Sequence, residues 1–376
     1  DGHGRAWAQR WLGRFGPALY HTEYAHRFLF RAAPPAARPL TDLPRAELFG
    51  RESCGYGFFR SDWPAPGKPD EATHVFFRMG DPMNVHGGVS AGEFQVFRRT
   101  PLADRSGKYS SYDSPPDQYH RNCISTNVVL FTEKGNASDR GDQRTRRGLK
   151  SDHKTWQQWL DIRDRAGHDV ARITDWQVGK NEARCRADLT KTNPPEKCKE
   201  WTREFVWVGH RHLLVLDVVE TAGPDVARQW QLHCPAPPEV GDRLLTVTAE
   251  APDHNWADAR LKPTQRSATL FCRTLAPADY TAVVNTQDGA RAYGPDGKDR
   301  GEVPGNPFHR KYGKHVVQIA PAGTETRTVF LHVLTAVDAG AAAPPEASCR
   351  LVRPGRAEVT VDGLTTTLSV PEWFGR

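Results

Sequence analysis

The chain has 376 residues and carries 51 lysines and arginines against 45 aspartates and glutamates, for a formal net charge of +6. No apolar run approaches the roughly 18 residues that a membrane-spanning helix needs, so the sequence predicts a protein with no membrane partner. The small positive excess suits an acidic polymer, and because no nucleic-acid-binding motif accompanies the basic residues, we expect no nucleic-acid partner.

The amino-terminal part of the chain has a helical pattern. The sequence starts without a methionine or a hydrophobic leader, which indicates a mature, trimmed or partial product. Across residues 1–30, aromatic and leucine side chains recur at helical spacing on both sides of a break at Gly16-Pro17. Residues 33–50 hold four prolines and predict an extended connector. We therefore expect residues 1–50 to form a short helical segment and its connector.

From Gly57 onward the sequence alternates between apolar and polar residues. This alternation predicts strands over residues 57–63, 73–79, 93–97, 127–131, 156–160, 205–208, 212–219, 230–233, 244–248, 268–272, 315–319, 328–334, 358–361 and 364–368. Many short strands separated by turns are typical of stacked antiparallel sheets. We predict a mainly β fold, a layered antiparallel β-sandwich over residues 51–300, and a C-terminal β lobe over residues 301–376.

The seven cysteines include no C-x-x-C pair, which argues against a zinc ribbon or a thioredoxin-type motif. Cys185 and Cys198 bracket a polar loop between two predicted strands. A disulfide between them would close this loop, and two free thiols are the alternative.

One segment, residues 86–107, concentrates groups that are suited to acid–base chemistry. It begins with His86 beside two glycines, continues into an alternating strand, and ends in a turn that contains Asp104. Histidine titrates near neutral pH, and this arrangement would aim both side chains into one cleft. Taken alone, however, a histidine such as His86 is ordinarily a turn or surface residue, and Asp104 is ordinarily a hairpin residue that accepts backbone N–H groups.

Together with residues 59–63, 119–122 and 126–130, this segment resembles the histidine-containing motif of the heparinase II/III-like domain of polysaccharide lyases. The resemblance covers most of the chain. It implies that the amino-terminal helices are the end of an α/α toroid that precedes layered β-sandwiches, with the substrate cleft between them. Most of the toroid is not in this sequence, so the resemblance implies a partner toroid on a missing segment or on a second chain.

The resemblance also implies an activity. Such lyases cleave a uronic-acid polysaccharide, such as a glycosaminoglycan or alginate, by β-elimination. A base removes the C5 proton, an acid protonates the O4 leaving group, and hydrogen-bond donors or cations neutralise the carboxylate. We therefore expect a polysaccharide lyase that is secreted or periplasmic and has an acidic polysaccharide as its substrate.

The resemblance assigns roles to individual residues. His86 matches the catalytic-cleft histidine, Asn127 matches the asparagine of a His-Asn pair, and Arg121 matches the arginine before it. Tyr119 is our preferred phenolic acid or base, although most aromatic residues in strands and loops pack against neighbours. We expect His86 and Tyr119 to be catalytic, and Asn127 and Arg121 to line or order the substrate site.

Two further residues are candidates for substrate binding. His233 lies on an alternating strand, where it would either face the floor of the cleft or be a buried, hydrogen-bonded histidine. Arg146 belongs to the densest basic stretch, residues 140–150. This stretch would either guide a polyanion with its arginine forks or be a solvated surface loop.

The sequence departs from the resemblance where a structural zinc is expected. Many such proteins bind zinc through two histidines and an aspartate, whereas Gly88 and Thr126 stand at the two histidine positions here and only Asp104 remains. One carboxylate cannot hold zinc in a tetrahedral site. We predict no metal and no other cofactor. The same departures favour an alternative function, a non-catalytic protein that binds acidic glycans or acts as a scaffold.

Overall fold

The computed structural model describes residues 38–65, 70–81, 90–106, 123–136, 138–143, 155, 157–158, 170–250, 267–286, 291–293, 299–302, 315–340 and 343–375. The labelled elements of these residues are strands β1 to β22 and three 3-10 helices, at Leu40–Asp42, Cys123–Ser125 and Thr190–Thr192. None of the described helices is long and apolar enough to cross a membrane. The predicted mainly β class is confirmed. The helical segment expected in residues 1–30 and the strand expected over 156–160 lie outside the described residues, apart from the isolated positions 157–158.

The strands form antiparallel sheets. The N-terminal sheet has the order β1-β2-β3-β4-β5, with strands Ala46–Phe49, Tyr56–Arg60, His74–Arg78, Phe94–Arg98 and Thr100–Ala103. The central sheet has the order β12-β13-β14-β19-β10-β9-β8-β7, with strands Glu239–Gly241, Leu244–Glu250, Ser267–Ala276, Arg327–Asp338, His212–Thr221, Cys198–Val208, Glu182–Asp188 and Arg172–Val178.

Two smaller sheets cover the central sheet. The four-stranded sheet has the order β15-β18-β11-β6, with strands Tyr280–Thr286, His315–Pro321, Val226–Cys234 and Val129–Glu133. The C-terminal sheet has the order β20-β21-β22, with strands Ala347–Arg353, Arg356–Val361 and Leu364–Ser369. A separate pair joins β16 (Arg291–Tyr293) to β17 (Asp299–Glu302).

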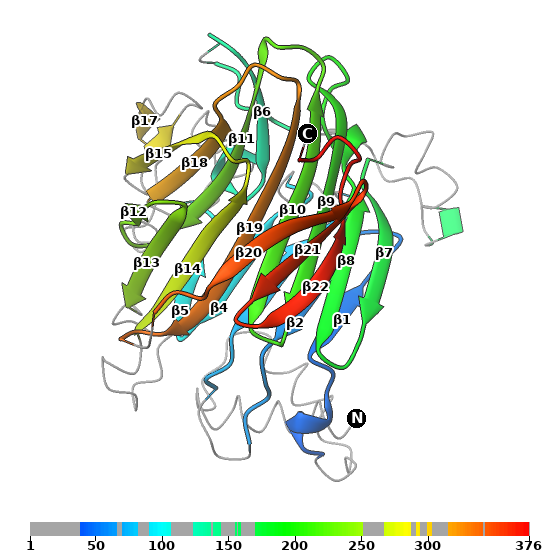
Figure 1. The fold of residues 1–376 in the computed structure, drawn as a ribbon, viewed down its shortest axis with the longest axis vertical. Helices are drawn as coiled ribbons and strands as arrows, with labels where there is room; N and C mark the ends of the chain where they lie inside the picture. Colours follow the sequence, from blue (N-terminus) through cyan, green and yellow to red (C-terminus); the bar gives the residue numbers. More distant parts are fainter. Residues whose placement is uncertain are drawn as a thin grey trace.

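These sheets stack in three layers, with the C-terminal sheet in front of the central sheet in Figure 1. On one face of the central sheet, Phe205 and Trp207 of β9 pack against Phe77 and Phe59 of the N-terminal sheet, at ring-centroid distances of 5.0 and 6.1 Å. On the other face, β10 side chains such as Leu214 join a second hydrophobic core with the C-terminal sheet. Strand β10 is buried on both faces because both faces are covered, which explains its nearly continuous apolar sequence.

The sheets cross the boundary that the sequence predicts at residue 301. Strands β18 and β19 follow this residue, yet β18 pairs with β11 and β19 pairs with β10. Only β20 to β22 form a sheet of their own after residue 301. The division of the chain into domains therefore stays a prediction, while the strand pairing joins residues from both sides of the boundary.

Of the two alternatives for Cys185 and Cys198, the structure has the free thiols, and both residues are buried. The register of the two strands explains this result. Cys185 of β8 is paired with Phe205 of β9, and Cys198 lies seven residues further along β9. At about 3.3 Å per residue this separation is about 23 Å, well beyond the roughly 6 Å between the Cα atoms of a disulfide.

Candidate functional site

Of the six predicted site residues, the structure describes Asn127 and His233. The other four, His86, Tyr119, Arg121 and Arg146, lie outside the described residues. The site is therefore built here from the two described residues, their partners, and the residues on either side of the segments 82–89, 107–122 and 144–154.

Asn127 is 1% exposed and connects three strands. Its Nδ2 donates to the carbonyl oxygen of Phe94 at 2.8 Å, and its Oδ1 accepts from the backbone N–H of His233 at 2.6 Å. Its own carbonyl accepts from Arg203 Nη1 at 3.0 Å. Since both ends of the side-chain amide are bound to backbone groups, Asn127 orders the N-terminal and four-stranded sheets relative to each other.

His233 is fully buried, the second of the two arrangements that the sequence allows. Its Nδ1 lies 2.5 Å from Ser106 Oγ, and its carbonyl accepts from the backbone N–H of Asp104 at 3.0 Å. Burial, aided by the charge of Arg105, lowers the pKa of His233 to about 3. The imidazole is therefore neutral near neutral pH. Its part in substrate binding stays a prediction.

Two carboxylates lie near Arg105, the residue before Ser106. Burial raises the pKa of Asp104 to about 6, and the nearby charge of Glu93 acts in the same direction. The Asp104 side chain accepts from the backbone N–H of Arg105 at 2.7 Å, while Arg105 Nε lies 3.7 Å from Glu93 Oε2. Asp104 can thus change its charge close to neutral pH. We call Glu93, Asp104, Arg105, Ser106, Asn127 and His233 the polar cluster.

Each of the three segments that carry the four undescribed site residues has at least one end near the polar cluster. Ser106 precedes segment 107–122, and its backbone N–H donates at 2.9 Å to the carbonyl of Ser125, just after that segment. Gln143 precedes segment 144–154, and its side-chain amide makes two hydrogen bonds of 2.8 Å with the backbone of Ala91, which follows segment 82–89. The fold therefore brings the boundaries of three separate segments to one place.

A buried ion pair lies next to the polar cluster, and its residues were not among those predicted from the sequence. Arg203 and Asp217 are directly paired on β9 and β10, and both side chains are fully buried. The guanidinium donates through Nε and Nη2 to the two carboxylate oxygens at 2.6 and 2.8 Å, and Trp201 Nε1 also donates to this carboxylate at 2.7 Å. The signal was an aspartate in the middle of the most apolar strand, which requires a buried partner.

Arg203 reaches from this ion pair to the segment boundaries. Its Nη1 donates to the carbonyl of Gly92 at 2.5 Å and to that of Asn127. Gly92 has a φ of +91°, and a Cβ there would lie 2.8 Å from Leu189 Cδ1, so only glycine fits without rearrangement. One arginine thereby fixes the backbone that follows segment 82–89 and the backbone before β6.

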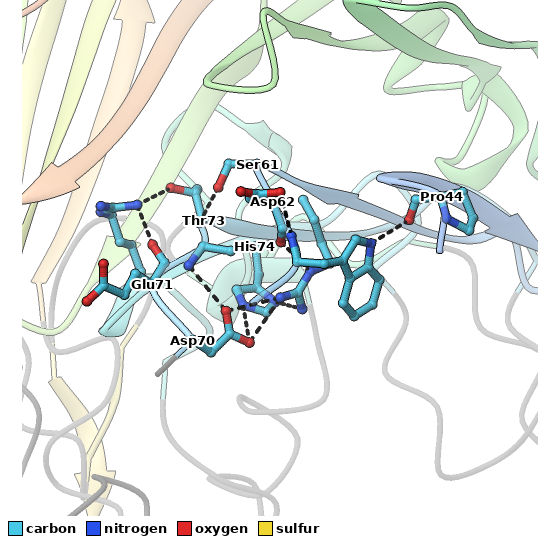
Figure 2. Close-up of polar contacts among 11 residues, drawn as sticks. Pro44, Ser61, Asp62, Asp70, Glu71, Thr73 and His74 are labelled. Atoms are coloured by element: carbon cyan, nitrogen blue, oxygen red, sulfur yellow. Dashed lines mark hydrogen bonds and ion pairs between the residues drawn. The ribbon is translucent and has the colours of Figure 1, made fainter. Parts of the chain in front are cut away.

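A second polar network, shown in Figure 2, joins β2 and β3 to the loop between them. Arg60 donates to both oxygens of Asp70, at 3.1 and 2.9 Å, and to His74 Nδ1 at 2.9 Å. His74 Nε2 faces Asp70 at 3.5 Å, and the guanidinium lies 3.9 Å above the ring of Trp63. Hydrogen bonds from His74 and Arg60 hold the pKa of Asp70 well below its usual range, against the effect of burial. Because both nitrogens of His74 have partners, we interpret this network as structural.

Among the described residues, no group of three or more histidine, cysteine, aspartate or glutamate side chains is arranged to hold a metal ion. Thr126, at one of the expected zinc-histidine positions, donates through Oγ1 to the carbonyl of Cys123 at 3.0 Å. Its hydroxyl thus closes the short helix at Cys123–Ser125. Gly88 lies outside the described residues, and the absence of a zinc stays a prediction.

Neither protein-family models nor curated proteins match the sequence. Solved structures do match the fold. A mutant of heparan sulfate lyase HepC from Pedobacter heparinus aligns over 100% of this chain and 49% of its own, with a TM-score of 0.56 and 15% identity. The heparinase III-BT4657 gene product aligns over 98% and 47%, with a TM-score of 0.57 and 13% identity. A further heparinase III aligns over 87% and 43%, with a TM-score of 0.54 and 13% identity.

The chain thus spans about half the length of the solved structures that it matches. At identities of 13 to 15%, the likeness concerns the arrangement of the backbone. It agrees with the resemblance read from residues 86–107, which rests on side chains. The chain therefore has a heparinase-like fold.

Proposed function

We propose that this chain is the β-sandwich part of a polysaccharide lyase that cleaves an acidic, uronic-acid-containing glycan by β-elimination. The observation that carries the proposal is the polar cluster, where the boundaries of the three segments with His86, Tyr119, Arg121 and Arg146 meet within a heparinase-like fold. Residues that act on one sugar must come together from separate segments, and this arrangement supplies such a place.

In the proposed reaction, His86 and Tyr119 share the proton transfers. One takes the proton from C5 of the uronic acid, and the other gives a proton to O4 as the C4–O4 bond breaks and the C4–C5 double bond forms. Arg121 and Arg146 neutralise the sugar carboxylate, which makes the C5 proton removable. Asn127 and neutral His233 hold the surrounding backbone in place.

The proposal extends to the surroundings of the enzyme. The substrate is a glycosaminoglycan, alginate or a related polymer, and the enzyme is secreted or periplasmic. A helical toroid, on another segment or on a second chain, completes the cleft. The finding that this chain spans less than half the length of the heparinases is in keeping with such a partner.

The experiment is an assay of the unsaturated-uronate absorbance band with heparan sulfate, chondroitin sulfate and alginate. We expect product with at least one polymer, and we expect His86→Ala to lower kcat/KM by about 100-fold or more, as removal of a general acid or base does. His210→Asn is the matched control. It lies at a positive φ in the β9–β10 turn, beyond the end of β9 at Val208, which is five strand residues or roughly 17 Å from Arg203.

Full activity of His86→Ala would contradict the role of His86. Binding of acidic glycans without any unsaturated product would instead support the alternative, a non-catalytic glycan-binding protein. Thr126 in place of a zinc-binding histidine favours that alternative, because it marks a departure from the pattern of the lyases at this very cluster.

A further inference from the structure

A second polar site lies where the C-terminal sheet meets the edge of the central sheet. It is a pocket of about 540 Å³ that opens to solvent, a volume within the range of about 300 to 1,000 Å³ that is usual for ligand pockets. Its lining includes Gln177 and Arg184 of β7 and β8, Thr367 and Ser369 of β22, and Arg353 and Arg356 at the β20–β21 turn.

The pocket and the polar cluster lie on opposite sides of the central sheet. Arg184 is paired with Val206, which belongs to the core under the C-terminal sheet. Phe205 precedes Val206 on β9 and so points to the opposite face, where it belongs to the core under the N-terminal sheet. This is the side of the polar cluster. Figure 1 shows the C-terminal sheet crossing in front of the strands of the central sheet. A ligand in this pocket would therefore not compete with one at the polar cluster.

Two arginines face each other across the turn that lines this pocket. Arg353 and Arg356 are directly paired on β20 and β21 and flank Pro354 and Gly355. Gly355 has a φ of +82°, and a proline followed by such a glycine is the pattern of a type II turn. Side chains of directly paired residues lie on one face about 5 Å apart, and like charges at such positions repel.

The described residues supply no ion pair for either of these guanidinium groups. Another pair in the same hairpin shows the usual arrangement. Arg350 is paired with Glu358, and its Nη2 lies 2.6 Å from the carboxylate. The hairpin thus combines an arginine with a glutamate away from the pocket, and an arginine with an arginine at the pocket.

The other lining groups add hydrogen-bond donors but little charge. Arg184 donates to Glu182 and lies 3.2 Å from Glu204, so its charge is already compensated by these two carboxylates. Gln177 and Ser369 are neutral and provide an amide and a hydroxyl. The uncompensated charge of the pocket therefore comes from Arg353 and Arg356.

We propose that this pocket binds an oxyanion group of an acidic glycan chain, a sulfate or a carboxylate, between the forks of Arg353 and Arg356. An oxyanion placed between two guanidinium groups accepts charge-assisted hydrogen bonds from both and removes their repulsion. The choice of a glycan as the source of the oxyanion rests on the proposed function, whereas the oxyanion chemistry of the pocket does not.

The test uses a heparin-derived hexasaccharide, the same hexasaccharide after desulfation, and inorganic sulfate. Calorimetry is combined with arginine modification by phenylglyoxal, read by peptide mass spectrometry. We expect the hexasaccharide to protect Arg353 and Arg356 but not Arg350 and Arg327. We expect the double substitution Arg353→Gln and Arg356→Gln to weaken binding at this pocket about tenfold, as loss of two charge-assisted contacts does.

The matched control is the double substitution Arg350→Gln and Arg327→Gln, which removes the same charge from two exposed ion pairs outside the pocket. Equal losses in both double variants, or no protection of Arg353 and Arg356, would overturn the proposal. Inorganic sulfate that binds as tightly as the hexasaccharide would overturn the glycan as the source. Absence of unsaturated product would contradict the proposed lyase. The protection of Arg353 and Arg356 would still show whether the pocket binds the oxyanion.

Discussion

Arginines on the two sides of the central sheet have opposite environments. On the face toward the N-terminal sheet, Arg203 is fully buried and bound to both oxygens of Asp217. On the face toward the C-terminal sheet, Arg353 and Arg356 are exposed and have each other as cross-strand neighbours. Arg203 is closed to a ligand because it is fully buried and its Nε, Nη1 and Nη2 all donate to Asp217 or to backbone carbonyls.

The difference follows from solvent. A buried charge costs several kcal/mol unless it is paired, and the fully buried Arg203 accordingly lies against its counterion Asp217. At the surface, water screens two like charges, so an unpaired couple costs little and stays available to bind an anion. The buried Arg203–Asp217 pair fixes the backbone around the polar cluster, whereas the exposed Arg353 and Arg356 are candidate recognition groups.

The largest effect is expected on breaking the buried pair. Asp217→Asn keeps the shape of the side chain but leaves the charge of Arg203 unpaired in the core. We expect the free energy of unfolding, measured with urea, to fall by about 3 to 5 kcal/mol. Arg327→Ala, which removes an exposed ion pair with Glu220, should cost less than about 1 kcal/mol.

If Asp217→Asn does not fold, replacing both partners, Arg203→Met with Asp217→Leu, supplies a second measurement. This double variant removes both charges and is expected to be more stable than the single one, because no unpaired charge remains. A single variant within about 1 kcal/mol of the wild-type protein would contradict the structural role of the ion pair.

An intermediate effect is expected at Asp104. Its pKa is about 6 in the folded protein against an ordinary value of 3.8, so the folded state favours the protonated form. The stability from this group is fully present below pH 4 and is lost as pH rises through 6. Asp104→Asn cannot ionise. Its free energy of unfolding should therefore rise by about 2 kcal/mol relative to that of the wild-type protein between pH 4 and pH 7.

Urea unfolding at several pH values measures this difference. Glu93→Gln serves as the companion variant, since the charge of Glu93 contributes to the raised pKa and its removal should shrink the effect. A difference between Asp104→Asn and wild type that stays constant or falls with rising pH would show that Asp104 ionises as freely as in the unfolded chain.

Much of this fold could be predicted from alternation, and the failures have physical causes. Strands rich in large apolar residues, such as β10 and β19, were predicted. Strand β8 was expected before the Cys185–Cys198 loop but was given no range, because its buried positions hold Ala183, Cys185 and Ala187, which are too small to give a strong apolar signal. The undecided state of Cys185 and Cys198 and the missed Arg203–Asp217 pair share one cause, since both depend on the register between strands.

The candidate site likewise has residues that the sequence predicted and residues that only the folded chain reveals. His86, Asp104 and Asn127 were selected from the sequence through a resemblance to known lyases, and His233 through its position on an alternating strand. Their partners Ser106 and Gly92 were not selected, because a serine and a glycine in loops carry no pattern. The contact of Asn127 with the backbone of His233 joins residues more than a hundred positions apart, which only the folded chain reveals.

The smallest effect is expected in the β20–β21 hairpin, where it distinguishes Arg353 from Arg350. Arg353→Thr removes one of two like charges, and we expect it to raise the free energy of unfolding by a few tenths of a kcal/mol at low ionic strength. Arg350→Thr removes the partner of Glu358 and should lower it by a similar amount. Both differences should fade at about 1 M salt, where the screening length is about 3 Å. If Arg353→Thr destabilises the protein as Arg350→Thr does, Arg353 has a counterion in the folded state, and its charge is not free to hold an anion.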